Sequence, residues 1–288
     1  MRVLVTGAAG YIGLHVVRSV CDVYPESEVF VVDVRNGGLD NRANFLNVNI
    51  LTECNNEGLF EKVGNPDVCI HLAWQDGFNH NSNAHIDNLA AHFHFLRNLM
   101  EHGCKSVSVM GTMHEIGYWE GEVNSDTPCN PFSMYGIAKN ALRQALLSYC
   151  EGKAVSLKWL RAYYITGDDE RNKSVFSKIL QMANEGAKTF PCVLGTNKCD
   201  FIDVELLAKY IAIASLQNKI DGIINVCSGK PVALKDKING FVKEKKLDIH
   251  LDYGAFPSRK YDSPAIWGNT ELIDKIMEDY KKRALGMF

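Results

Sequence analysis

The chain has 288 residues, of which 46% are hydrophobic, and its 31 basic and 34 acidic residues give a formal charge of −3. This length and composition allow a sizeable core without disulfide bonds, in one large domain or in one domain with an appended lobe. The near-neutral charge, with no basic block longer than KEKK at 243–246, argues against a nucleic-acid-binding protein.

The cysteine and histidine spacings favour neither a disulfide framework nor a metal site. The nine cysteines are scattered and include no Cys-x-x-Cys pair, which fits reduced thiols. His92 and His94 lie two residues apart, on different faces of a helix, so we interpret them as packing or surface groups. The sequence shows neither an apolar run of about 18 residues nor a secretory leader, so we expect a soluble, cytoplasmic protein without membrane contact.

The first 165 residues alternate strands with helices. The patterns predict strands at 2–6, 29–34, 67–72, 106–110 and 154–160, and helices at 11–23, at 84–101 and following residue 133. The alternation predicts an α/β fold with a doubly wound, mostly parallel Rossmann sheet at 1–165. An apolar stripe along 84–101 predicts packing on the sheet or on a partner subunit; it comprises Ile86, Leu89, Ala90, Phe93, Leu96, Leu99 and Met100.

The later segments are less regular. They predict helices at 175–185, at 204–216 and from about 234, with a strand at 222–226. We interpret 166–288 as a smaller lobe, with segments near 199–230 returning to the sheet.

Three glycines separate the first strand from the first helix. Gly7, Gly10 and Gly13 stand in TGAAGYIG, where backbone N–H groups at a helix start face an anion and glycine permits close approach. The spacing is GxxGxxG rather than the commoner GxGxxG, and glycine-rich turns of this kind also occur for structural reasons alone. The motif therefore indicates a dinucleotide site only together with other residues.

Asp33 supplies that second indication. It stands 20 residues after Gly13, at the end of the second predicted strand, where a carboxylate can bind the adenosine ribose hydroxyls. The same carboxylate repels a 2′-phosphate. We therefore expect NAD rather than NADP, with Arg35 nearby as a feature that softens this preference, and an ordinary turn residue as the alternative role of Asp33.

A tyrosine and a lysine lie four residues apart in SMYGIAK, at 133–139. Residues at this spacing share one face of a helix, so the phenol of Tyr135 and the ammonium of Lys139 point to the same side. The same spacing also occurs by chance in many helices. Its meaning depends on the rest of the chain.

Seven segments stand in order along the chain: TGAAGYIG with Asp33, HLAW at 71–74, MGTMHEIG at 110–117, YGIAK at 135–139, CDFIDVELLAKYI at 199–211, GIINVCSGKPVAL at 222–234 and RKYD at 259–262. Together they resemble the extended short-chain dehydrogenase/reductase family, and within it the nucleotide-sugar epimerases, dehydratases and reductases. The resemblance thus covers nearly the whole chain.

The resemblance implies roles for the catalytic side chains. Tyr135 resembles the family's catalytic acid or base, and Lys139 the residue that holds the nicotinamide ribose and lowers the phenol pKa. Thr112 matches the hydroxyl residue that binds the reacting oxygen. The resemblance also implies a C-terminal substrate-binding lobe, a nucleotide-sugar substrate, and a homodimer in which the 84–101 helix and the helix after Tyr135 form a four-helix arrangement with their copies.

The resemblance further implies two sets of binding residues. The cofactor set comprises Gly7, Gly10, Tyr11, Ile12, Gly13, Asp33, Asn49, Ile50, Leu72, Ala73, Trp74 and Lys139. The substrate set comprises Trp74, Asn88, His114, Tyr164, Lys198 and Arg259. Asn88 has the alternative of a surface polar residue, and Arg259 that of an ion pair with Asp262.

Departures from the family pattern narrow the chemistry. The dehydratases carry an Asp-Glu pair after the catalytic threonine, and here Met113 and His114 stand there, so dehydration is not expected. Tyr164 replaces an asparagine and Cys199 an arginine that usually hold the nucleotide diphosphate, with Lys198 as a substitute. Aromatic and polar residues near the catalytic loops suit a sugar ring, or alternatively the core of a long loop; they are Trp74, His114, Glu115, Tyr118 and Trp119.

Three hypotheses follow. The first is an NAD(P)-dependent reductase of a 4-keto-6-deoxy sugar nucleotide, because the catalytic residues are present and the dehydratase pair is absent. The second is a nucleotide-sugar 4-epimerase, which reduces its keto intermediate again after that intermediate has rotated. The third is a dinucleotide sensor without catalysis, against which the intact Thr112, Tyr135 and Lys139 argue.

Overall fold

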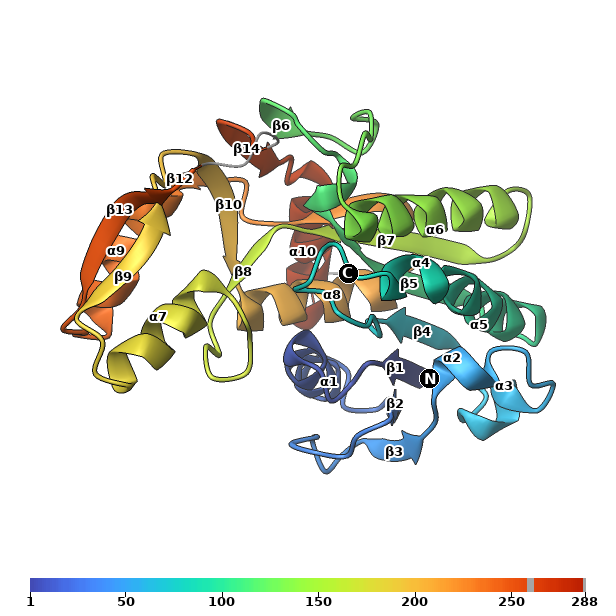
Figure 1. The fold of residues 1–288 in the computed structure, drawn as a ribbon. Helices are drawn as coiled ribbons and strands as arrows, with labels where there is room; N and C mark the ends of the chain where they lie inside the picture. The colour runs from blue at the N-terminus through green and yellow to red at the C-terminus, as the bar shows by residue number, and fades with distance from the viewer. Residues whose placement is uncertain (258–261, 287–288) are drawn as a thin grey trace.

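A parallel sheet of seven strands forms the centre of the computed structural model, which describes residues 1–257 and 262–286 (Figure 1). Its spatial order is β11, β7, β5, β4, β1, β2, β3. In that order the strands span Gly222–Val226, Ser156–Ala162, Ser106–Thr112, Val68–His71, Arg2–Thr6, Glu28–Asp33 and Asn44–Asn47. The winding reverses between β1 and β4, and ligands of such sheets bind at the strand ends beside this point. The predicted doubly wound α/β fold is confirmed.

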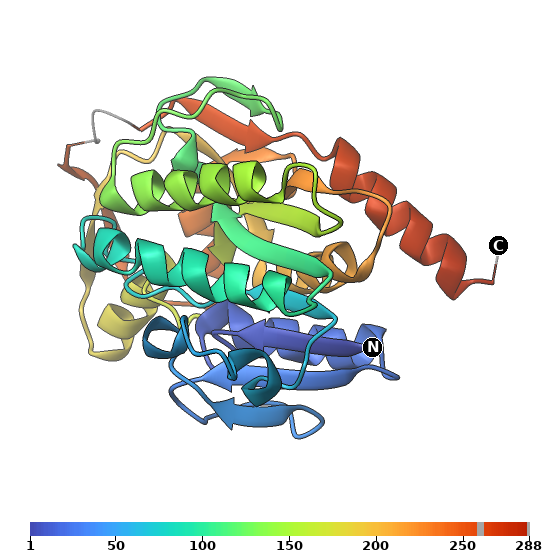
Figure 2. The same cartoon turned by 90° about the vertical axis from the view of Figure 1, so that its right-hand side faces the viewer.

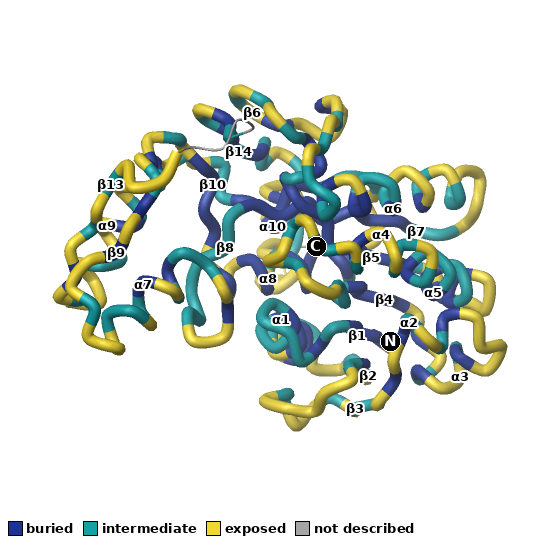
Figure 3. Tube along the Cα trace, in the orientation of Figure 1, coloured by how far each residue is buried: buried dark blue, intermediate teal, exposed yellow. Residues whose placement is uncertain are grey.

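Helices cover both faces of this sheet. One face carries α1 (Tyr11–Val23), α8 (Val204–Leu216) and α10 (Glu271–Ala284). The other carries α2 (Ile50–Glu53), α3 (Leu59–Lys62), α4 (Ala84–Asp87), α5 (Leu89–Glu101) and α6 (Met134–Cys150), with α5 and α6 side by side in Figure 2. Successive side chains of a strand point to opposite faces of the sheet, so each strand contributes to the hydrophobic core on both faces. In β1, Val3 and Val5 pack on the first face and Leu4 on the second. Figure 3 shows the buried strands between the partly exposed helices.

A smaller lobe joins the sheet at the carboxyl ends of its strands. Its mixed sheet contains β6 (Gly121–Val123), β8 (Tyr164–Thr166), β10 (Lys198–Asp203), β12 (Pro231–Ala233) and β14 (Ala265–Gly268). A second unit pairs β9 (Thr189–Val193) with β13 (His250–Phe256) and packs them against α7 (Val175–Asn184) and α9 (Leu234–Glu244). The single turn η1 (Met113–Glu115) follows β5.

Several elements differ from the sequence prediction. The helix expected at 84–101 is interrupted at Asn88, and Leu96, Leu99 and Met100 of its stripe are buried in the core of this same chain. The strand expected at 154–160 is shifted to 156–162. The three-residue strands and α10 were not predicted, because such strands are too short for a periodic pattern and α10 buries only Ile273, Ile276 and Met277.

The two regions of the chain exchange segments. α8, β11 and α10, all from the second half, pack with the first sheet, whereas β6 from the first half lies in the smaller sheet. Within the described residues no helix has the length and apolar composition needed to cross a membrane. In that same part of the chain, no three His, Cys, Asp or Glu side chains are grouped to hold a metal ion. The side chain of His92 is buried and hydrogen-bonded to His71.

Candidate active site

The turn between β1 and α1 is built around two glycines that admit no side chain. Gly7 has φ +68°, and a Cβ there would lie 2.6 Å from the backbone nitrogen of Ala73. A Cβ on Gly13 would lie 2.2 Å from the carbonyl oxygen of Gly7. The turn therefore needs glycine for close backbone packing, and it leaves the start of α1 without a covering side chain.

The start of α1 has the features of an anion site. Its N-cap is Gly10, no side chain caps the helix, and its first turn contains no acidic residue. The first-turn N–H groups and the positive end of the helix dipole therefore remain for a phosphate. The Asp33 carboxylate lies beside the turn and accepts a hydrogen bond of 3.1 Å from the backbone N–H of Ala9. These residues fit a dinucleotide whose ribose lies on Asp33 and whose pyrophosphate lies on the helix start.

The other predicted cofactor residues fall into two groups. Leu72 and Ala73 lie at the glycine turn, where their N–H groups donate to Thr6, while Ile12 packs partly on the core beneath it. The remaining three have structural partners. The Tyr11 hydroxyl donates to the carbonyl of Gly167 at 2.7 Å, the Asn49 side chain caps α2, and Ile50 is buried in the core.

Thr112 and Tyr135 come together from different elements. Thr112 ends β5 and is buried, and Tyr135 is the second residue of α6, whose N-cap Ser133 accepts a bond from the backbone of Gly136. The Thr112 side chain lies beside the Tyr135 phenol, close enough to act on its pKa. The start of α6 is held in place because the backbone N–H of Tyr135 donates to the carbonyl of His80 at 2.9 Å.

Lys139 lies one helical turn beyond Tyr135 and is only 2% exposed. Its Nζ donates to the carbonyl of Met110 at 2.8 Å and lies 3.8 Å from the centroid of a Trp74 ring. Burial lowers the pKa of Lys139 to about 7. The ammonium is thus held by a carbonyl and an aromatic face rather than by a carboxylate.

The pKa of the phenol moves opposite to the expectation. Burial raises the pKa of Tyr135 to about 12, although the hydrogen bond from Thr112 acts to lower it. The Lys139 Nζ lies 6.0 Å from the centroid of the phenol ring. Desolvation of the phenol therefore outweighs the cation in this arrangement, and the phenol holds its proton at neutral pH.

Two histidine rings contact Trp74 and hold it in place. Its indole N–H donates to His85 Nδ1 at 3.0 Å, and its ring stacks on His92 with 4.5 Å between centroids. His92 is hydrogen-bonded to His71 at 3.0 Å, and burial lowers the pKa of His92 to about 3. These rings fix the orientation of Trp74 beside Lys139.

His80 is a site residue that the sequence did not indicate. Its ring stacks on that of Tyr135 with 5.2 Å between centroids, and it lies 4.4 Å from the ring of His114. Both histidines line a cleft between the two lobes, with Tyr164, Asn197, Cys199 and Asp262 among the other lining residues. His80 belongs to a loop without a motif, and only the docking of that loop on α6 brings it to the phenol.

The remaining predicted substrate residues are only partly brought together. His114 and Tyr164 line the cleft, with 6.3 Å between their ring centroids. Asn88 lies at the junction of α4 and α5 and donates to Gln75 at 3.1 Å, and Lys198 is exposed at the start of β10. Arg259 lies outside the described residues.

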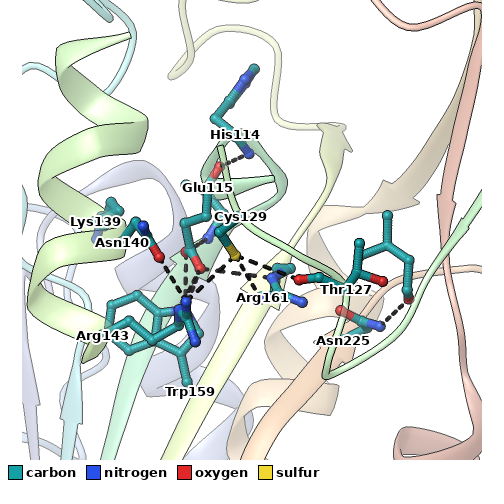
Figure 4. A network of polar contacts seen from close by, with 12 residues as sticks. His114, Glu115, Thr127, Cys129, Lys139, Asn140, Arg143, Trp159, Arg161 and Asn225 are labelled. Atoms are coloured by element: carbon teal, nitrogen blue, oxygen red, sulfur yellow. Dashed lines mark hydrogen bonds and ion pairs between the residues drawn. The ribbon is translucent and has the colours of Figure 1, made fainter. Parts of the chain in front are cut away.

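Glu115 does not face a sugar. Its side chain is fully buried behind β5 and presents no acid or base to the cleft. Met113 lines the cleft but carries no titratable group. Tyr118 is 44% exposed and bonds to Glu120 instead. The alternative of loop-core residues holds for Glu115, whose carboxylate lies in a network with Arg143, Trp159 and Arg161 (Figure 4).

Comparison with known proteins places this geometry in a family. Residues 3–227 match the model of the NAD dependent epimerase/dehydratase family. The chain is 40% identical over 269 residues to dTDP-6-deoxy-L-talose 4-dehydrogenase (NAD(+)) of Aggregatibacter actinomycetemcomitans, covering 93% of this chain and 99% of that protein.

Solved structures share the fold. MoeE5 in complex with UDP-glucuronic acid and NAD superposes with a TM-score of 0.82 at 20% identity, over 99% of this chain and all of that one. The UDP-glucose 4-epimerase of Thermus thermophilus in complex with NAD has a TM-score of 0.80 at 20% identity, over 97% and 93% of the two chains.

Proposed function

The chain belongs to the NAD dependent epimerase/dehydratase family, and on that premise we propose that it interconverts a nucleotide-activated 6-deoxyhexose and its 4-keto form with NAD. Its cofactor is NAD and its substrate class is the nucleotide sugars. The proposed reaction is the hypothesis of a 4-keto-6-deoxy sugar nucleotide reductase, written in either direction.

One observation carries the proposal, namely the meeting of Thr112, Tyr135 and Lys139 beside the glycine turn. NAD, when bound, supplies the hydride acceptor or donor for the sugar carbon. Tyr135 Oη exchanges the proton of the sugar oxygen, and the Thr112 hydroxyl donates a hydrogen bond to that oxygen as its negative charge develops. Lys139, with its ammonium one turn away, lies where it can bind ribose hydroxyls.

The protonation of the site matches the reducing direction. A phenol whose pKa is raised to about 12 holds its proton at neutral pH and can give it to an alkoxide. The reverse reaction needs the phenolate, and below that pKa the phenolate fraction rises about tenfold for each unit by which the pH increases. We therefore expect reduction of the ketone to be the faster direction at neutral pH.

The choice of substrate is supported by the 40% identical 4-dehydrogenase and by the residues after Thr112. The buried thioether of Met113 has no proton to give, so the acid that a dehydratase needs is absent at that position. The 6-deoxy group and the thymidine nucleotide rest on that relative alone.

The test uses purified protein with NAD+ and dTDP-6-deoxy-L-talose, followed by the absorbance of NADH, with the matching 4-keto sugar and NADH for the reverse direction. We expect both reactions, and their loss in Tyr135→Phe. No NADH formed or consumed would overturn the proposal. Interconversion of UDP-glucose and UDP-galactose without net NADH would instead support an epimerase, and a biological activity unchanged in Tyr135→Phe would support a sensor.

A further inference from the structure

A fully buried carboxylate lies directly behind the catalytic threonine, outside the chemistry assigned above. Glu115 ends the single turn η1, three residues after Thr112, and both its own side chain and that of Arg161 are 0% exposed. Such a charge is costly to bury unless it is paired and hydrogen-bonded. Its partners therefore indicate what it does.

The carboxylate first holds the end of the catalytic strand. Its Oε1 accepts a hydrogen bond of 2.7 Å from the backbone N–H of Thr112. The Thr112 hydroxyl in turn accepts from the backbone N–H of His114 at 3.3 Å, so that Thr112 and Glu115 cap each other. This reciprocal cap fixes the backbone from which the Thr112 hydroxyl reaches Tyr135.

The carboxylate also binds the neighbouring strand. The indole N–H of Trp159, on β7, lies 2.9 Å from each carboxylate oxygen, and the Nε of Arg161 lies 3.7 Å from Oε2. Gly111 leaves space for this indole, since a Cβ at Gly111 would lie 2.1 Å from the indole nitrogen. Glu115 therefore holds β7 against the end of β5 beside Thr112.

The third link reaches the helix that carries the phenol. Arg143 is four residues beyond Lys139 and eight beyond Tyr135, so the three share one face of α6. Its Nε lies 3.5 Å from Glu115 Oε2, and its Nη2 donates to Asn140 at 2.7 Å. Figure 4 shows Glu115 between Arg143 of the helix and Arg161 of the strand.

We propose that Glu115 is a positioning residue, whose buried carboxylate sets the distance between Thr112 and Tyr135 by binding an arginine on each of two neighbouring elements. The two catalytic side chains come from β5 and α6, two separate elements. The ion pair between Glu115 and Arg143 joins the end of β5 to α6 close to Thr112 and Tyr135. A misplacement of about 1 Å at such a site is enough to cost on the order of 100-fold in rate.

The test removes only the ion pair between Glu115 and Arg143 of α6. Arg143→Met keeps the aliphatic stem and leaves Glu115 paired with Arg161, so the buried pair is balanced in charge. We expect kcat to fall on the order of tenfold or more, with each KM changed less than about twofold, because binding contacts are untouched. Arg143→Lys restores a cation within reach of the carboxylate and is expected to recover most of kcat.

The matched control is Arg97→Met, which removes the partly exposed pair of Arg97 with Glu101 on α5, 3.7 Å apart, and is expected to leave kcat unchanged. The inference rests on the proposed chemistry of Thr112 and Tyr135, but not on the sugar. All variants are assayed with dTDP-6-deoxy-L-talose, or with UDP-glucose if the wild type converts only that. Absence of turnover by the wild type refutes the proposed function, whereas the ratio between variants tests the positioning.

Two results would overturn the positioning role. The first is a folded Arg143→Met variant with kcat within twofold of the wild type. The second is an Arg143→Lys variant as slow as Arg143→Met, which would assign the effect to the guanidinium contacts with Asn140 and Cys129 instead. If Arg143→Met does not fold, the Lys variant decides alone, because the proposal requires it to be active.

Discussion

Replacement of Lys139 by methionine is expected to change how the stability of the protein depends on pH. Met keeps the length and apolar stem of lysine but carries no charge. In the wild type, burial lowers the pKa of Lys139 from 10.5 to about 7. Between these two values the unfolded chain binds more protons at this residue than the folded protein, so the free energy of unfolding rises with pH.

The size of the effect follows from the two pKa values. At pH 7 the unfolded lysine is fully protonated and the folded one about half, and at pH 9 the folded one is almost entirely neutral. Linkage then gives the wild type a gain of about 2 kcal/mol between pH 7 and pH 9 that Lys139→Met lacks. The carbonyl of Met110 loses its donor in the variant, which lowers stability by a constant amount at every pH.

The assay is urea unfolding of both proteins, freed of NAD, at pH 7, 8 and 9. Neighbouring titrations do not interfere, because burial lowers the pKa of His71 and His92 below this window and raises that of Tyr135 to about 12. The cysteine thiols are the same in the wild type and in Lys139→Met, so their titration cancels when the two proteins are compared. Parallel stability curves, with the same difference at all three pH values, would refute the reasoning that a buried, largely desolvated ammonium lies beside Trp74.

Four further results are expected. Thr112→Val removes the hydroxyl beside the phenol and should lower kcat about 100-fold with little change in KM, in steady-state assays. Gly13→Ala, whose Cβ would meet the Gly7 carbonyl at 2.2 Å, should lower thermal stability and NAD binding, whereas Gly37→Ala, with nothing within 4 Å, should do neither. Asp33→Ser should weaken NAD binding about tenfold and improve NADP binding relative to NAD, measured by cofactor fluorescence. The rate of sugar oxidation should rise with pH between 7 and 9 as the phenolate fraction of Tyr135 increases, and a flat profile of the chemical step would exclude that base.

The expected dimer stays a prediction. Part of the apolar stripe at 84–101 is used inside this chain, as Leu96, Leu99 and Met100 are buried against its own sheet. Ile86 is 39% exposed and Ile137, on α6, is 42% exposed, which leaves apolar groups on the outer side of both helices. Light scattering of the purified protein distinguishes a dimer from a monomer.

The sequence determined the features that depend on local chemistry. Short apolar, β-branched runs and helical apolar patterns located the strands and long helices of the first sheet. The glycines at 7, 10 and 13, with Asp33, indicated the phosphate turn, because close backbone approach requires glycine. The spacing of Tyr135 and Lys139 placed them on one helical face before any tertiary contact was considered.

Only the tertiary structure decided the electrostatics of the site. The sequence placed a cation one turn from a phenol and suggested a lowered phenol pKa, but the pKa depends on burial. The fold brings the Met110 carbonyl from β5 and Trp74 from the loop after β4 to the ammonium. The sequence left Glu115 open between a sugar contact and the core of a long loop, because its arginine partners are distant in the chain and meet only when β5, α6 and β7 pack together. Desolvation and long-range ion pairs are properties of the folded interior, and no local pattern of residues specifies them.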